Sequence, residues 1–173
     1  MAVRDIIKLP NPILKTVSAP VPAVTEEVRA LVKDMFDTMY AAPGIGLAAV
    51  QIGLRKRIVV TDVAKDDEPK APMCFINPEI VWRSEDTTEY EEGCLSIPEV
   101  YDKVVRPAEV RVRYMDLEGE EKAIHCTGLL ATCIQHEIDH VNGVLFIDHL
   151  GRLKRDRIVK KFIKAAKLDK EEV

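Results

Sequence analysis

The chain has 173 residues and a net charge of −4 at pH 7, which suits one domain with a hydrophobic core and argues against general binding of nucleic acid, DNA included. No apolar run approaches the roughly 18 residues that span a bilayer, so no membrane segment is expected. The first residues, Met1–Asp5, do not resemble a signal peptide, so the expected location is the cytoplasm, where the four cysteines would be reduced thiols.

The N-terminal part predicts an extended segment, an amphipathic helix and a glycine-rich stretch. Residues 4–9 are expected to be extended, and several prolines keep the next residues out of regular structure. From about Thr25 to Pro43, apolar residues recur every three or four positions, which predicts a core-facing helix. Ten uncharged residues follow, Gly44–Gly53, three of them glycine. Taken alone, this stretch predicts a tight turn and a buried strand.

The middle of the chain is rich in β-branched residues and turn signals. Six segments read as strands: Arg57–Thr61, Met73–Ile76, Ile80–Arg83, Thr87–Tyr90, Val110–Tyr114 and Lys122–Cys126. Asn77-Pro78 is expected to stop the second strand. The third and fourth are expected to pair with each other, and Leu117–Glu120 turns the last two into a hairpin. Such short connections imply antiparallel pairing.

A helical period of apolar residues predicts a buried helix from about Thr127, the expected N-terminal cap, to Asn142. Within it, His136 and His140 are four residues apart, so both imidazoles lie on one face, one turn apart. The pattern is H-E-x-x-H, in which two imidazoles bind one metal ion and Glu137 handles a proton. A buried histidine pair beside carboxylates needs a reason such as a metal.

A catalytic site of this kind needs a third protein ligand, and the residues leave several candidates open. The extended motif with a third histidine is excluded because Phe146 occupies that position, and the downstream region that would supply a glutamate is basic. His125 and His149 are less favoured. Among the cysteines Cys94 ranks first, because the glycine before it and the proline after it indicate a specified, irregular backbone. Cys133 lies one turn before the first motif histidine and is expected to line a pocket.

The last segment, Arg152–Lys167, predicts a helix with a narrow apolar stripe and eight basic residues against one acid. Two interpretations remain open for this charge. It is either a solvated helix face or a contact surface for an anionic partner.

Three segments together resemble the peptide deformylase family: Gly44–Gln51, Glu92–Ser96 and Gln135–His140. They occur in the family's order and at its separations, and the resemblance covers nearly the whole chain. It implies a single α+β catalytic domain over residues 1–173. Antiparallel sheets would surround a central helix that carries the histidines, with an N-terminal helix and a basic C-terminal helix over about 152–168.

The resemblance also implies a ligand set and a metal. Cys94, His136 and His140 would bind the ion and leave one position open for water. The family's physiological metal is Fe(II), and Zn(II) or Ni(II) can occupy the same site. The ligand types alone do not choose, because one cysteine and two histidines suit zinc at least as well.

The implied activity is hydrolysis of the N-terminal formyl group from formyl-methionine of nascent proteins, with release of formate. Glu137 would move the proton of an activated water, and the Gln51 side-chain amide and the Leu95 N–H would stabilise the oxyanion. Glu92 is expected to pair with Arg106. The expected substrate-binding residues are Gly44, Ile45, Gly46, Tyr90, Glu92, Gly93, Leu129 and Cys133.

Two further hypotheses are a peptidase of the H-E-x-x-H type and a non-catalytic metal-binding or ribosome-associated module. The expected partners of the deformylase are formyl-methionyl nascent polypeptides. The basic C-terminal helix suggests a contact with the ribosome, where RNA is dense.

Overall fold

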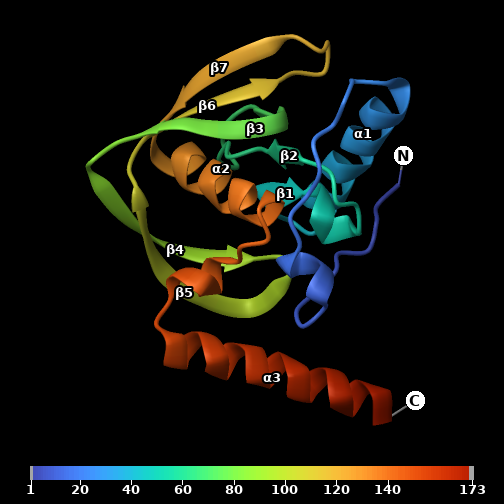
Figure 1. The fold of residues 1–173 in the computed structure, drawn as a ribbon, viewed down its shortest axis with the longest axis vertical. Coiled ribbons are helices and arrows are strands. Elements are labelled where there is room, and N and C mark those ends of the chain that lie inside the picture. Colours follow the sequence, from blue (N-terminus) through green and yellow to red (C-terminus); the bar gives the residue numbers. More distant parts are fainter. Residues whose placement is uncertain (1, 172–173) are drawn as a thin grey trace.

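The computed structural model describes residues 2–171 and has a central helix between two antiparallel sheets (Figure 1). The helices are α1 (Glu26–Ala41), α2 (Gly128–Val141) and α3 (Arg152–Glu171). Single 3-10 turns lie at η1 (Pro12–Lys15), η2 (Ala49–Ile52) and η3 (Phe146–His149). The strands are β1, Gly46–Ala48, β2, Ile58–Thr61, β3, Met73–Arg83, β4, Thr87–Cys94, β5, Ile97–Pro107, β6, Val110–Met115, and β7, Glu121–Cys126. The predicted α+β class is confirmed.

One sheet has five strands in the order β1-β2-β3-β6-β7, and the other is the β4-β5 hairpin. Every strand pair is antiparallel, and the predicted hairpin of β6 and β7 is confirmed. The predicted pairing of Ile80–Arg83 with Thr87–Tyr90 is wrong. The first segment belongs to β3, which pairs with β6, and the second belongs to β4, which pairs with β5. Strand β5 was not expected because a proline lies near each of its ends and it lacks clear alternation.

Strand β3 continues through Asn77-Pro78, which the sequence was expected to use as a stop. Asn77 has a φ of 52°, and the register with β6 shifts between Ile76 and Glu79. A bulge suits this position because proline has no N–H to give to the ladder. The Asn77 side chain bonds the backbone N–H of Val21 at 2.8 Å and its carbonyl at 2.9 Å. Tertiary contacts therefore hold the irregular residue in place.

Helix α2 is the centre of the molecule (Figure 1), and ten of its residues are buried, so its polar groups must find partners inside the protein. Thr127 stands at the N-cap position, but its side chain makes no capping hydrogen bond, so its predicted capping role is wrong. The predicted stop is confirmed. The helix ends at Val141 with Asn142 as its C-cap residue, and Gly143 takes a φ of 75°.

The N-terminal residues 4–9 form no strand. Arg4 holds the start of this segment against α1, because it donates to the Asp34 carboxylate at 2.8 Å and its backbone N–H donates to Thr38 Oγ1 at 2.9 Å. The backbone N–H groups of Ile7 and Leu9 donate to the carbonyl oxygens of Gln51 and Ser96. Helix α1 lies where the apolar spacing predicts it. The strand expected in Gly44–Gly53 is confirmed as β1, but it is only three residues long and gives way to η2.

Helix α3 lies along one edge of the molecule, beside the β4-β5 hairpin (Figure 1). One stripe of the helix, formed by Ile158, Val159 and Phe162, packs on a hydrophobic cluster that includes Ile97 and Phe146. Its other faces are largely exposed. Among the described residues, no helix has the length and apolar character needed to cross a membrane.

Gly143 should be more sensitive to substitution than an ordinary left-handed glycine. A Cβ there would stand 2.6 Å from the Lys15 carbonyl oxygen and 3.0 Å from that of Thr16, and backbone cannot move aside cheaply. We expect Gly143→Ala to cost several kcal/mol, against roughly 1–2 kcal/mol for Gly119→Ala, where only the positive φ is at stake. Urea unfolding of both variants measures the difference. Equal losses would contradict this account of the turn after α2.

Candidate metal centre

Cys94, His136 and His140 come together at one point, although the cysteine is far from the histidines in sequence. The Sγ of Cys94 lies 3.3 Å from Nε2 of His140, and ligand atoms of all three residues lie within 4.8 Å of one another. The two histidines project from α2, and Cys94 ends β4 at the tight turn into β5. Among the side chains that the structure describes, no other group of histidines, cysteines and acids is arranged to hold a metal.

This donor set fits a divalent transition metal. In a tetrahedral site with metal–sulfur bonds of about 2.3 Å and metal–nitrogen bonds of about 2.0–2.1 Å, sulfur and nitrogen lie roughly 3.5 Å apart. The 3.3 Å separation of Cys94 and His140 is close to that value. Burial lowers the pKa of His140 well below its ordinary value. His140 is therefore a neutral imidazole, the form that binds metals.

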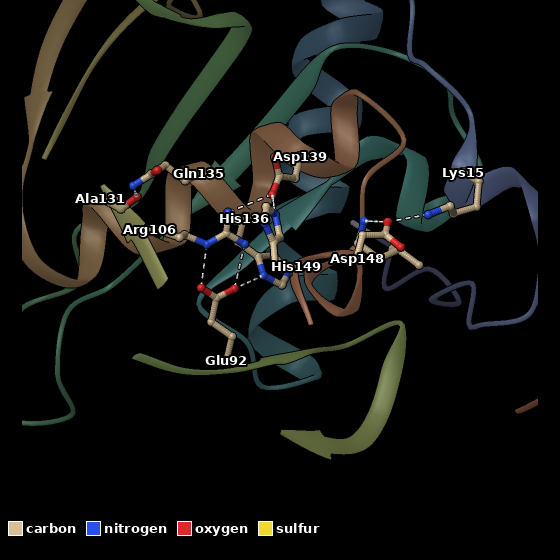
Figure 2. Close-up of polar contacts among 10 residues, drawn as sticks. Lys15, Glu92, Arg106, Ala131, Gln135, His136, Asp139, Asp148 and His149 are labelled. Atoms are coloured by element: carbon tan, nitrogen blue, oxygen red, sulfur yellow. Dashed lines mark hydrogen bonds and ion pairs between the residues drawn. The ribbon is translucent and has the colours of Figure 1, made fainter. Parts of the chain in front are cut away.

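The ring of His136 is oriented by a buried carboxylate (Figure 2). Oε1 of Glu92 lies 3.0 Å from Nδ1 of His136, which leaves Nε2 free to face the site. Arg106 donates to both Glu92 oxygens, at 2.7 and 2.9 Å, which confirms the ion pair expected from the sequence. Burial alone would raise the pKa of Glu92, but hydrogen bonds from His136 and Arg106 outweigh it and hold that pKa below its ordinary value.

Glu137 lies beside the ligand set with its carboxylate free of internal partners. It is 5 % exposed, and its Oε1 is buried without a hydrogen bond from the described residues. Burial raises the pKa of Glu137 to about 7. Gly46 makes room for the carboxylate, because a Cβ at that position would stand 2.6 Å from Oε2 of Glu137. The site thus holds a group that can take up or release a proton near neutral pH.

The side-chain amide of Gln51 has a defined orientation. Its Oε1 accepts from the Ala48 N–H at 2.9 Å, so its Nε2 faces the hairpin turn. Nε2 donates to Ser96 Oγ at 3.0 Å and lies 3.7 Å from Cys94 Sγ. Leu95 follows Cys94 directly, and its side chain packs over Gly44, where a Cβ would stand 2.7 Å from it. Gln51 and Leu95, the two residues predicted to supply oxyanion donors, therefore border the ligand set.

A cavity of about 780 Å³ opens in front of Glu137 and His136. Every residue expected to bind substrate lines it: Gly44, Ile45, Gly46, Tyr90, Glu92, Gly93, Leu129 and Cys133. Tyr90 and Leu129 are 38 % and 41 % exposed, so they are cavity walls and not ordinary core. The carboxylate of Glu92 is engaged by Arg106 and His136, which makes it a support for the ligand more than a contact for substrate.

Several residues of the site were not expected from the sequence. Part of the N-terminal segment also lines the cavity, as do Pro98, Glu99 and Tyr101. Gly93 has no side chain because a Cβ there would meet the Tyr101 ring at 2.5 Å. The less favoured ligand candidates lie elsewhere, His125 paired with Glu109 and His149 with Asp139. Asp139, which contacts both Arg106 and His149, was also not expected to belong to the site. Its position within the H-E-x-x-H motif, directly before His140, was the signal that could have identified it.

One cysteine, two histidines and a buried carboxylate in front of an open cavity define the class of mononuclear metallohydrolases. The family model described as polypeptide deformylase matches residues 3–156. A peptide deformylase from Afipia carboxidovorans is 62 % identical over 97 % of this chain and 98 % of its own. The chain therefore belongs to the peptide deformylase family and is an enzyme of that kind.

Solved structures agree with this assignment. The crystal structure of peptide deformylase from Ehrlichia chaffeensis superposes with a TM-score of 0.91 at 42 % identity, covering 97 % of this chain and 99 % of the other. A second structure of that protein, in complex with actinonin, gives a TM-score of 0.90 at 44 % identity and covers 95 % and 98 %. The fold expected from the resemblance is thus confirmed over nearly the whole chain.

Replacing Glu92 should lower the affinity of the site for a metal ion. Glu92→Gln removes the charge that orients His136 and leaves Arg106 with one carboxylate, and loss of such a support typically costs about 10–100-fold in metal affinity. Competition with a chromogenic chelator for Zn(II) measures the change. Glu89→Gln is the matched control, because this residue is exposed on the same strand and pairs only with Lys103, at 3.8 Å. Unchanged affinity in Glu92→Gln would contradict the positioning of His136.

Proposed function

We propose that this chain hydrolyses the formyl amide at the N-terminus of formyl-methionyl nascent proteins and releases formate. The observation that carries the proposal is the convergence of Cys94, His136 and His140 beside the unpartnered carboxylate of Glu137, in a chain of this family. The whole chain would act as one catalytic domain, with the basic helix as its last element.

The metal would be held by Cys94, His136 and His140, and we propose Fe(II) as the physiological ion, with Zn(II) or Ni(II) able to replace it. When bound, the ion supplies a Lewis acid that lowers the pKa of water from about 15.7 towards 7. A thiolate ligand makes Fe(II) electron-rich, so anaerobic purification with metal analysis is the way to identify the ion.

Glu137 would transfer the proton in this reaction. It takes a proton from the attacking water and gives it to the nitrogen of the methionine as the carbon–nitrogen bond breaks. Water adds to the formyl carbon, the amide bond is cleaved, and formate and a free amine result. Burial and the absence of an internal partner for Oε1 leave this carboxylate available for both transfers.

Gln51 and Leu95 would stabilise the oxyanion that forms at the formyl oxygen. The Ala48 N–H holds Gln51 Oε1, so the amide nitrogen is the end presented to the site. Such a donor is fixed before substrate arrives and does not reorient during the reaction, which is what makes oxyanion donors effective.

The methionine side chain would enter the wall formed by Ile45, Tyr90, Leu129 and Cys133, because an apolar slot suits a flexible thioether. The Cys133 thiol contacts the carbonyl oxygen of Ile45 at 3.6 Å, which fixes one side of the slot. Strand β1 is the outermost strand of its sheet, so the backbone at Gly44–Gly46 could pair with an extended substrate as an added strand.

Nascent formylated chains are made in the cytoplasm of bacteria, so we propose that the protein acts there. The test of the function is a formate-release assay on formyl-Met peptides, with unformylated peptides of the same sequence in parallel. Formate release without cleavage of internal bonds supports a deformylase. Cleavage of internal bonds without formate release would instead identify a peptidase of the H-E-x-x-H type.

Gln51→Ala should lower kcat by about 10²–10³-fold while the bound metal is retained, because one oxyanion donor is lost and no ligand is touched. Formate release and metal content of the same preparation measure the two effects. Normal turnover in Gln51→Ala would remove this residue from the mechanism. Loss of metal would show that Gln51 mainly supports the ligand Cys94 and does not act only as an oxyanion donor.

We also propose that α3 contacts ribosomal RNA. Lys160 and Lys164 are exposed, four residues apart on one face, and make no ion pair with the described residues. Lys160→Gln with Lys164→Gln should weaken ribosome binding and reduce its salt dependence, by about one unit of slope for each lost phosphate contact. Lys33→Gln with Lys65→Gln is the control of equal charge. Identical binding by both double variants would contradict the contact.

A further inference from the structure

The polar network around Arg106 continues from the metal centre to the protein surface (Figure 2). Asp139, next to the ligand His140 on α2, accepts a hydrogen bond from Arg106 at 2.9 Å. The same carboxylate oxygen lies 2.8 Å from Nε2 of His149. His149 is the last residue of η3, and its side chain is 37 % exposed. A continuous set of polar contacts thus joins a surface histidine to a ligand of the proposed metal.

We propose that His149 is a positioning residue for the metal centre. It holds Asp139 against Arg106, and Arg106 in turn holds Glu92 against His136. The proposal rests on the metal centre proposed above and deepens it, because it assigns a role to a residue outside the ligand set, the cavity and the H-E-x-x-H motif.

The contacts show why the outer end matters. Arg106 is only 4 % exposed and lies between two carboxylates, so its position depends on both of them. On the inner side, one oxygen of Glu92 is shared between Nη2 of Arg106, at 2.9 Å, and Nδ1 of His136, at 3.0 Å. A shift of the guanidinium therefore acts directly on the atom that orients the ligand.

The outer side of the network is where it is weakest. The Asp139 side chain is 24 % exposed, so water competes for it, whereas the Glu92 side chain is 5 % exposed. His149 gives this carboxylate a second internal partner. Without that partner, Asp139 can turn towards solvent, and Arg106 loses one of the two anions that fix it.

A competing explanation is that His149 only fastens η3 to α2. The chain offers a matched control for this possibility. His125 is also a surface histidine, 39 % exposed, with Nε2 2.6 Å from the Glu109 carboxylate, but this pair has no contact with the metal centre. Both histidines contact a carboxylate and have nearly the same exposure, and they differ in whether that carboxylate leads to Arg106. His125 also accepts a hydrogen bond from Arg111 at 3.2 Å, so its replacement removes a further contact.

The experiment is release of Zn(II) from the loaded full-length protein into an excess of chelator, which requires no catalytic turnover. His149→Ala should release Zn(II) about 3–10-fold faster than the parent protein. This is at the low end of the effect expected for residues that support a metal ligand, because His149 acts on the ligand through three intervening residues. His149→Gln keeps an N–H donor for Asp139 and should stay within about twofold of the parent rate. His125→Ala should leave release unchanged.

A second measurement separates positioning from simple loss of stability. The visible absorption of the Co(II)-loaded protein reports ligand geometry and should change in His149→Ala but not in His125→Ala. Equal release rates for His149→Ala and the parent protein would overturn the proposal. So would equal acceleration in His149→Ala and His125→Ala, or failure of His149→Gln to restore the rate. If the parent protein binds no Zn(II), the proposed metal centre itself fails.

Discussion

The site depends on one buried guanidinium. Arg106 is almost inaccessible to solvent, and it is tolerated there because Glu92 and Asp139 supply opposite charges and well-oriented acceptors. A buried ion pair contributes little to stability by itself, since desolvation offsets the attraction, but removing one partner leaves a costly unpaired charge. Here the pair also sets the direction of His136, so the same contacts that satisfy the interior prepare a ligand.

Close backbone approach is the second constraint on the site. Gly46 leaves the space that Glu137 fills, and Gly93 leaves the space for the Tyr101 ring. Gly44 does the same for Leu95. Gly46 thereby lets β1 approach α2, Gly44 lets the segment before β1 approach the turn of the β4-β5 hairpin, and Gly93 lets the two strands of that hairpin pack together. The uncharged, glycine-rich stretch is therefore explained by what packs against it and not by a flexible loop.

The sequence alone determined the elements whose signal is local. The 3.6-residue period marks α1 and α2, and the spacing of His136 and His140 places two imidazoles on one helix face. The family's motifs, read together, then implied Cys94 as the third ligand, the residues of the cavity wall and the α+β class. These predictions depend only on residue type, spacing and order, which are properties of the sequence itself.

Only the tertiary structure decided what depends on distant partners. Residue order does not show that β3 runs through Asn77-Pro78, because Val21 holds that irregular backbone from another part of the chain. It does not show that β4 pairs with β5 and leaves β3 to β6, since strand pairing is a choice among segments of similar pattern. From the sequence, His149 was only a less favoured candidate for the third metal ligand. Its contact with Asp139, through a carboxylate that also binds Arg106, exists only once η3 has folded back against α2.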